Sequence, residues 1–476
     1  MLTKPQIGSN GKPEIRHVAV IGAGPAGLTA AHTLAGAGIA VTVLERRRDT
    51  GGLGGTTTFE GKAGTYRFDY GGHRFITSNR DLLTLVEDLV GPDFLYADRR
   101  SVIRLDGRIY DYPLSVRNLL TTAPPSLLGG AAMDLATKLF RREQVNGDAD
   151  FETWTRARFG PTLYNRFFAG YTQKLWGIPP SDLSGDWAEQ RISLIDLKDV
   201  ARRLLPGSER GLRTYARTYR YPRHGFGMIF DRLAARVMAL GAEIRTGIGV
   251  TGFGYDGQRI DRVETDHGSV SCDAVISTVP LPDMVRLTGG QSSLTFRGLR
   301  FFNMMMDVED ISANTWQYLS DPHILATRLQ EPKRRSEEMA PPGKTSIMLE
   351  IPCDPGEPLW QMTDDELFAR VCPQLDSLGV NPDMASGEYF SARAANAYPL
   401  MRQGYQIERE KAFRHLGRIE NLTQCGRQGS FRYVFTDTAM EMGQMAAEAL
   451  IEGQDLRDAV RDHRNERVVI ETESIA

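Results

Sequence analysis

Residues 17–45 read HVAVIGAGPAGLTAAHTLAGAGIAVTVLE, and this stretch decides the fold. It begins with a continuous apolar run, which is typical of a buried parallel strand. Gly22, Gly24 and Gly27 follow with the spacing GxGxxG, and a second apolar run ends at Glu45. The pattern predicts a strand, a glycine loop, a helix and a second strand, which together form the start of a Rossmann-type nucleotide-binding unit.

The three glycines have separate roles in such a loop. The first permits a tight turn, the second lets a pyrophosphate approach the backbone, and the third allows close packing of helix and strand. Pro25 and Ala26 open the helix expected over 25–35, whose N-terminal amides would point at the phosphates. Glu45 follows Gly27 by 18 residues, where a carboxylate can bind ribose hydroxyls. The segment therefore predicts a bound dinucleotide.

A second glycine-rich stretch, RRRDTGGLGGTTT, comes directly after Glu45. Arg46, Gly52 and Leu53 are candidate cofactor contacts, because glycines let the backbone run close beside an extended ligand. NAD-binding domains normally continue with another helix here. The order of GxGxxG, acid and GG resembles instead the FAD-binding domains of the glutathione-reductase type, so the sequence favours FAD. The alternative, a surface loop without a ligand, stays open.

Later parts of the chain are expected to complete the FAD domain. After a helix expected over 226–239, Val250 stands where such domains pass a strand beside the adenine. A helix near the end is expected to begin at about Asp437, with Asp437 or Thr438 as its N-cap. Its N-terminus would point at the flavin pyrimidine and stabilise a reduced, anionic flavin. Met440, in the same turn, is a further candidate contact.

The expected fold class is α/β, with a glutathione-reductase-type Rossmann domain that binds FAD. This domain is discontinuous, because its segments are separated by long insertions. We expect it to comprise residues 14–80, 222–290 and 415–465. A mostly helical insertion is expected over 100–221, and a mixed-sheet substrate domain over 291–410 would cover the flavin.

The composition narrows the function classes. The formal net charge of the 476 residues is −3, so no global basic field points to nucleic acid. The four cysteines lack CxxC spacing, which argues against a zinc site or a disulfide framework and for a reducing compartment. We expect no bound metal. The polar N-terminus lacks the apolar core of a signal peptide, and glycines interrupt the most apolar stretch, so the sequence predicts a soluble, cytoplasmic protein without a membrane segment.

Several motifs resemble, in their order and spacing, those of one branch of flavoproteins. This is the UDP-galactopyranose mutase-like branch of the FAD-dependent amine oxidase and protoporphyrinogen oxidase superfamily. The resemblance covers about residues 15–455. The motifs that carry it are FDYGGHRF, YDYPL, YTQKLWGIPPSDLSGDWAEQRIS, YRYPRHGFGMIFDRLA, WQYLSDPHILATR, AYP and GRQGSFRY.

In these mutases the substrate is a nucleotide-diphosphate sugar. The resemblance implies that Arg191 and Arg328 clamp the diphosphate, a role that suits a guanidinium because its planar fork matches phosphate oxygens bidentately. It also implies substrate contacts from four tyrosines, which could donate hydrogen bonds to phosphate, and from two tryptophans. These residues are Tyr112, Tyr318, Tyr398, Tyr433, Trp176 and Trp316.

The resemblance further places three residues of DYGGHRF, at 69–75, against the flavin ring. Gly71 and Gly72 would let the backbone approach the ring, and His73 would be a flavin neighbour rather than a general base. Arg427 matches an arginine that contacts the flavin, and Asp437 stands where the family has an asparagine beside it. With Arg191 and Arg328, His73 completes the candidate catalytic set.

The chemistry implied by the resemblance is carried by the cofactor. The reduced flavin would attack the anomeric carbon of the sugar, so that the ring opens and recloses in the other ring size without net redox change. The flavin must first be reduced, and NAD(P)H is the candidate reductant. This would explain why the sequence has no recognisable Ser–His–Asp set, Cys–His pair or carboxylate dyad.

Three departures from the family pattern leave the substrate open. FTDT stands at 435–438 in place of Asn-Gln-Asp-His, Thr172 in place of an asparagine near the uridine, and RQG at 427–429 in place of Arg-Phe-Gly. We therefore weigh a mutase-like enzyme of glycan or natural-product biosynthesis against an FAD oxidase or dehydrogenase of the amine oxidase or protoporphyrinogen oxidase type. A non-catalytic scaffold that retains FAD is the third reading.

Overall fold

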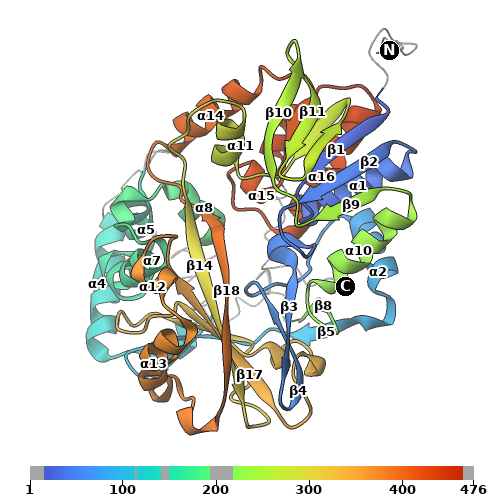
Figure 1. The fold of residues 1–476 in the computed structure, drawn as a ribbon. Helices are drawn as coiled ribbons and strands as arrows, with labels where there is room; N and C mark the ends of the chain where they lie inside the picture. Colours follow the sequence, from blue (N-terminus) through green and yellow to red (C-terminus); the bar gives the residue numbers. More distant parts are fainter. Residues whose placement is uncertain (1–14, 113, 115, 141–148, 193–217, 465–476) are drawn as a thin grey trace.

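The computed structural model describes residues 15–112, 114, 116–140, 149–192 and 218–464 of the chain. A five-stranded parallel sheet lies at the upper right of Figure 1. Its strands, in spatial order, are β19 (Leu422–Gln424), β13 (Ala274–Ser277), β1 (His17–Ile21), β2 (Ala40–Glu45) and β9 (Glu243–Thr246). The expected α/β fold class with a parallel sheet is confirmed.

Both faces of β1 are covered, which explains its continuous apolar sequence. Val18 and Val20 belong to an apolar cluster on one face, while Ala19 and Ile21 belong to a cluster on the other. Helices cover the first face, and these are α1 (Pro25–Gly36), α10 (Met228–Ala239) and α16 (Thr436–Ile451). An antiparallel sheet covers the second, formed by β10 (Val250–Asp256), β11 (Arg259–Thr265) and β12 (Gly268–Ser271).

A seven-stranded sheet forms the other half of the molecule. The long strands β14 and β18 run through the middle of Figure 1. In spatial order the strands are β18 (Ala385–Pro399), β14 (Phe296–Met306), β17 (Thr345–Pro352), β16 (Arg328–Gln330), β15 (Trp316–Leu319), β6 (Ser101–Leu105) and β7 (Arg108–Asp111). All neighbouring pairs are antiparallel except β15 and β6.

Two short antiparallel pairs and a set of helices complete the described fold. The pairs are β3 (Thr56–Gly61) with β4 (Gly64–Asp69), and β5 (Phe94–Asp98) with β8 (Thr218–Pro222). The further helices are α2 (Arg80–Val90), α3 (Val116–Thr122), α4 (Pro125–Phe140), α5 (Phe151–Phe159), α6 (Pro161–Leu163), α7 (Gly170–Trp176), α8 (Gly185–Ile192), α11 (Leu281–Leu287), α12 (Pro358–Gln361), α13 (Asp364–Leu375), α14 (Tyr405–Leu416), α15 (Gly426–Gly429) and α17 (Arg457–Asp462). No helix in the described part of the chain is both long and apolar enough to cross a membrane.

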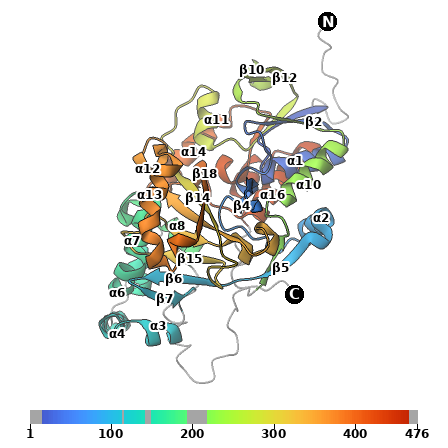
Figure 2. The ribbon, with the colours of Figure 1, turned by 60° about the horizontal axis from the view of Figure 1, so that its bottom comes forward.

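One local expectation is incomplete and one is wrong. The range 100–221 contributes strands as well as helices, because β6 and β7 extend the seven-stranded sheet and lie beside α3 and α4 in Figure 2. The expected N-cap of the last long helix is wrong, since α16 begins at Thr436 and is preceded by Phe435 in extended conformation. Asp437 lies inside the first turn, where its buried carboxylate contacts Thr77 and Thr438.

Glycines allow α1 to pack against its neighbours at backbone contact distance. A Cβ on Gly27 would stand 1.9 Å from the carbonyl oxygen of Gly22. A Cβ on Gly443 of α16 would stand 2.0 Å from the carbonyl oxygen of Ala26. Because neither separation is possible for real atoms, both positions require glycine if the helices are to keep this arrangement.

We expect Gly443→Ala to lower the free energy of unfolding by about 1–3 kcal/mol, because the added methyl forces α16 away from α1. Urea denaturation of both proteins measures the difference. Gly36→Ala is the matched control, since a Cβ there meets nothing within 4 Å and the helix gains up to about 1 kcal/mol from alanine. Equal losses in the two variants would contradict the packing argument.

Candidate functional site

The GxGxxG loop has the geometry of a phosphate cradle. Gly22 has φ 102° and leaves no room for a side chain, because a Cβ would meet Thr278 Oγ1 at 2.0 Å. At Gly24, by contrast, a Cβ would have no atom within 4 Å. The space in front of Gly24 is therefore open, at the N-terminus of α1, where Pro25 is the first helical residue. This is the arrangement that a pyrophosphate requires.

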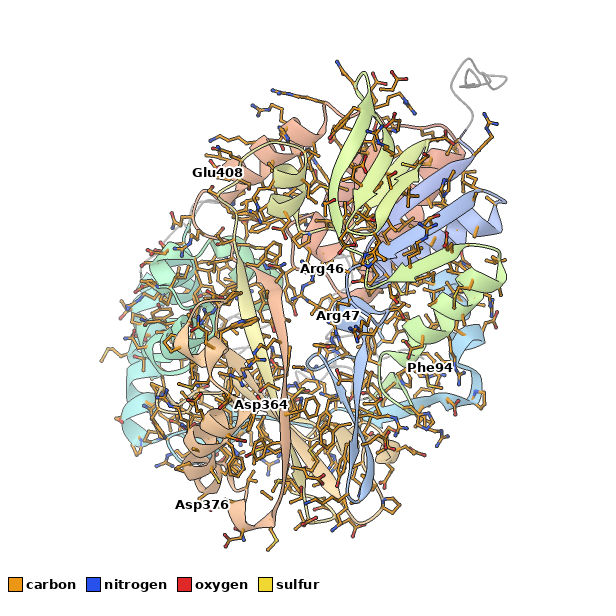
Figure 3. All side chains as sticks on the ribbon, viewed as in Figure 1. Arg46, Arg47, Phe94, Asp364, Asp376 and Glu408 are labelled. Atoms are coloured by element: carbon orange, nitrogen blue, oxygen red, sulfur yellow. The ribbon has the colours of Figure 1, made fainter. Side chains whose placement is uncertain are left out.

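Glu45 ends β2 next to this loop, as the sequence predicts. Its buried carboxylate accepts hydrogen bonds from the amides of Ala23 and Arg47, both at 2.8 Å. The two bonds hold it beside the glycine loop with acceptor capacity left over for ribose hydroxyls. Arg46 is exposed, and it lies with Arg47 between the parallel sheet and the long strands in Figure 3.

The second glycine loop touches the first. The amide of Gly51 donates to the carbonyl of Ala23 at 2.8 Å, and a Cβ on Gly52 would stand 3.3 Å from Gly24 Cα. Leu53, next in the chain, lines the central cavity. The two glycine loops are thus in contact, and the second leads along the chain to the cavity wall at Leu53, which fits an extended dinucleotide such as FAD.

Asp69, the first residue of the DYGGHRF segment, anchors the segment through hydrogen bonds to its carboxylate. Its buried carboxylate accepts hydrogen bonds from the Thr56 hydroxyl at 2.6 Å, the Phe226 amide at 3.0 Å and the Tyr221 hydroxyl at 2.5 Å. Gly71 follows with φ 109°, a conformation that favours glycine. Anchoring on three sides holds this turn in one conformation at the cavity wall.

His73 is a neutral histidine at this wall. Burial lowers its pKa below 6.5, although Asp69 opposes the shift. One ring nitrogen, Nε2, lies 3.0 Å from the carbonyl oxygen of Tyr70. Because a carbonyl can only accept, Nε2 carries the proton and Nδ1 keeps a lone pair. The ring stacks on Phe226 at 5.0 Å between centroids, which fixes its orientation.

A cavity of about 320 Å³ lies where these loops meet the seven-stranded sheet. It gathers twelve of the residues proposed from the sequence. From the cofactor set these are Leu53, Gly71, Gly72, His73 and Arg427, and from the substrate set Tyr112, Trp176, Trp316, Tyr318, Arg328, Tyr398 and Tyr433. Candidates of both sets therefore face one common space.

The other proposed residues lie outside the cavity lining. Val250 opens β10 within the apolar cluster of the antiparallel sheet, and Met440 is fully buried in the core beside α1. Asp437 directly follows the lining residue Thr436, and burial raises its pKa to about 6. Arg191 falls in the last turn of α8, and its side chain lies outside the described residues.

Arg328 is the best-defined cation of the cavity. It pairs across two strands with Glu350, whose carboxylate lies 2.9 Å from the guanidinium and is 1 % exposed. Its Nη2 also donates to the Tyr398 hydroxyl at 2.7 Å. Burial alone would lower the pKa of Arg328, but Glu350 and the nearby tyrosines raise it well above its ordinary value. Arg328 is therefore charged at every accessible pH.

Sequence reasoning missed Glu350, Tyr171 and Trp187, which also line the cavity. Glu350 was detectable as a lone acid in the apolar run TSIMLEIP, since a carboxylate in a buried strand requires a partner. Tyr171 carried no such signal, because aromatic residues are common on buried helix faces. Trp187 packs edge-to-face on the proposed Trp176 at 4.7 Å.

Across the described residues, no cluster of three or more histidine, cysteine or acidic side chains could hold a metal ion.

Comparisons with known proteins identify relatives of this chain. The model of the family described as flavin containing amine oxidoreductase matches residues 25–451. A phytoene dehydrogenase of Streptomyces griseus is 27% identical over 417 residues, which are 76% of this chain and 79% of that protein. A dTDP-fucopyranose mutase of Escherichia coli is 30% identical over 166 residues, 35% of this chain and 43% of the mutase.

Among solved structures, the chain is similar to a reduced UDP-galactopyranose mutase. The TM-score is 0.80 at 21% sequence identity, and the match covers 97% of this chain and 100% of the mutase chain. At this identity the likeness shows the fold.

We expect Gly24→Ala to leave the apoprotein as stable as the original protein while it lowers FAD affinity. A methyl group there touches no protein atom, but it occupies the space that the pyrophosphate needs. The check is a pair of measurements, the urea midpoint of the apoprotein and the flavin bound after reconstitution. Gly36→Ala, in the same helix, should change neither flavin content nor affinity. Full flavin binding by Gly24→Ala would contradict the assigned cradle.

Proposed function

We propose that this chain, which belongs to the flavin-containing amine oxidoreductase family, acts on a nucleotide-diphosphate sugar at bound, reduced FAD. The charge of the cavity carries the proposal. Among the lining residues that the structure describes, three are arginines, Arg74, Arg328 and Arg427, and one is a carboxylate, Glu350. His73 adds no charge near pH 7 because its pKa is lowered. This excess of positive charge favours an anionic ligand and disfavours a protonated amine.

The tyrosines around Arg328 suit a diphosphate. Tyr318 is its cross-strand partner, and Tyr398 accepts a hydrogen bond from its guanidinium. Phenols in these positions can donate to phosphate oxygens without adding charge. We assign Arg328 to the diphosphate as a fork-shaped donor, and we assign Arg191 to the same group on the basis of the family resemblance.

When bound and reduced, FAD would supply the nucleophile that the anomeric carbon requires. The protein then needs no nucleophile–base pair of its own, and its residues bind and orient the sugar nucleotide. Edge-to-face contacts of Trp187 with Trp176 and Tyr433 close the aromatic wall that would keep water out. His73 and the backbone of Gly71 and Gly72 would face the flavin rather than the substrate.

The competing function is an FAD oxidase or dehydrogenase for an amine, a porphyrinogen or a similar apolar substrate. It is favoured by the aromatic lining, which includes Phe151, Phe167, Phe168 and Phe301. Two observations weigh against it. The rings of Tyr398 and Tyr433 are 5.6 Å apart and nearly parallel, so they contact each other and leave no slot for an amine. The described lining also contains no lysine.

We further propose a cytoplasmic role in glycan or natural-product biosynthesis, with NAD(P)H as the reductant. The four cysteines are free thiols, three of them buried, which supports a reducing compartment.

The proposed function is tested with the purified flavoprotein under anaerobic conditions. UDP-galactose and dTDP-fucose are incubated with oxidised and dithionite-reduced protein, and the pyranose and furanose forms are separated by chromatography. We expect ring interconversion by the reduced protein alone, without net flavin oxidation. Oxygen consumption with amines or porphyrinogens, combined with no interconversion of any sugar nucleotide tried, would establish the competing function instead.

Replacement of Arg328 should weaken binding of UDP by about 1.5–3 kcal/mol, the scale of hydrogen bonds to a charged group. Arg328→Met alone also leaves Glu350 buried without its cation, so the protein should be less stable. The double variant Arg328→Met/Glu350→Gln removes that penalty and separates the two effects. It should regain stability but not UDP affinity, as measured by thermal unfolding and by titration.

Two further variants complete this test. Arg191→Ala should lose UDP affinity on the same scale, because it is assigned to the same diphosphate. The control is Arg245→Met, which breaks an exposed surface pair with Glu243 and should change neither quantity. Unchanged UDP affinity in the double variant of Arg328 and Glu350 would remove Arg328 from the site.

A further inference from the structure

Lys174 lies on α7, the helix that presents four residues to the cavity, namely Tyr171, Thr172, Leu175 and Trp176. Its own side chain points elsewhere. The ammonium nitrogen Nζ lies within hydrogen-bond distance of four backbone carbonyl oxygens. They belong to Leu319 at 2.6 Å, Asp321 at 3.0 Å, Ile324 at 3.1 Å and Ala326 at 3.0 Å.

Three of the four carbonyls, those of Asp321, Ile324 and Ala326, belong to the loop 320–327 between β15 and β16, and the fourth belongs to Leu319, the last residue of β15. Tyr318 and Arg328, which flank this segment, are cavity residues that pair across the two strands. The loop is closed at its base by the Leu319 amide, which donates to the Thr327 carbonyl at 2.9 Å. This segment therefore connects directly to Tyr318 and Arg328, which strand pairing holds at the cavity.

A protonated amine is the group that such a ring of carbonyls requires. An ammonium has three N–H donors and no acceptor, so it can satisfy converging carbonyl oxygens that would otherwise repel one another. Burial lowers the pKa of Lys174 to about 7, although the Asp321 carboxylate, whose Oδ1 accepts from the Asp106 amide at 2.8 Å, opposes the shift. The tests below are therefore made at pH 6, where the amine is protonated. Carbonyl dipoles, rather than a salt bridge, hold the lysine.

The residue that follows Lys174 is held to the sheet by a second cation. Arg297 of β14 donates from Nε to the carbonyl of Leu175 at 3.1 Å, and from Nη2 to the carbonyl of Pro352 at 3.2 Å. Two cations therefore hold this short helix to the seven-stranded sheet. Lys174 of the helix donates to carbonyls at and after the end of β15, and Arg297 of β14 donates to the helix carbonyl of Leu175.

We propose that Lys174 is a positioning residue for the cavity. Its ammonium ties the wall that carries Trp176 to the strand pair that carries Tyr318 and Arg328, and so sets the spacing between two sides of the ligand site. The inference rests on the proposed function only for the choice of UDP as the binding probe.

The test compares Lys174→Ala with Lys411→Ala, a control on the surface of α14 whose lysine pairs with Glu408 and is 61% exposed. Both variants should fold and bind FAD, judged by the visible spectrum. Lys174→Ala should lose about ten-fold in UDP affinity, the equivalent of one charge-assisted hydrogen bond. Lys411→Ala should bind UDP as the original protein does.

Chemical rescue distinguishes positioning by the ammonium from a general loss of packing. Propylammonium can fill the space of the missing side chain in Lys174→Ala and donate three N–H bonds to the carbonyls. Tetramethylammonium carries the same charge but has no N–H group. We expect millimolar propylammonium to restore UDP affinity and tetramethylammonium at equal concentration to have no effect. Equal rescue by both ions, or original affinity in Lys174→Ala without any ion, would overturn the proposal.

A second readout does not depend on the ligand. Hydrogen exchange of the amides at 319–327 should become faster in Lys174→Ala and slower again with propylammonium, since the ammonium holds this loop. If the original protein fails to bind UDP, the proposed function fails while the exchange measurement still decides the role of Lys174. Unchanged exchange in this loop would overturn the positioning role itself.

Discussion

The carbonyl oxygen of Gly22 occupies the place where any side chain at residue 27 would begin. This steric contact sets how α1 leaves β1, and the equivalent contact of Gly443 with Ala26 sets how α16 lies on α1. The contact of Gly27 with Gly22 places the open side of Gly24 at the N-terminus of α1. The contact of Gly443 with Ala26 places the start of α16 at the cavity wall, which Phe435 and Thr436 line. The glycines at 27 and 443 therefore set the position of the phosphate loop and of one part of the cavity wall.

The cavity combines a local motif with a non-local sheet. The glycine loops come from the first quarter of the chain, whereas Arg328 and Glu350 are brought together by the pairing of β16 with β17. The buried Glu350 carboxylate needs a cation close by, and the strand register supplies it. Gly71, Gly72 and Arg74 of DYGGHRF line the same cavity, and Asp69 anchors the turn that carries them. The cavity wall therefore combines glycine backbone with the charges of the arginines and Glu350.

The parts of the site that were predictable are those encoded by local spacing. Gly22, Gly24, Gly27 and Glu45 lie within one strand–helix–strand unit, so their geometry follows from short-range pattern alone. Family resemblance extended the prediction to Tyr318, Arg328 and Tyr398, which the structure brings to one cavity.

Glu350 and Lys174 were not predicted because their contacts are with residues far away in the sequence, which the local sequence does not reveal. Glu350 requires the register of β16 on β17, and Lys174 requires a loop 145 residues or more away. The start of α16 was misjudged because Asp437, a good N-cap type, is used inside the turn.

The order of strands in the parallel sheet has a consequence for synthesis of the chain. β1 and β2 leave the ribosome early, but the other neighbour of β1 is β13. The two strands are far apart in the sequence, since His17 and Asp273, which are hydrogen-bonded, are separated by 256 residues. At translation rates of about 5–20 residues per second, that edge of β1 waits on the order of ten to fifty seconds for its partner. The nascent chain thus leaves one edge of an apolar strand unpaired throughout the translation of more than half the protein, a state in which aggregation competes with folding.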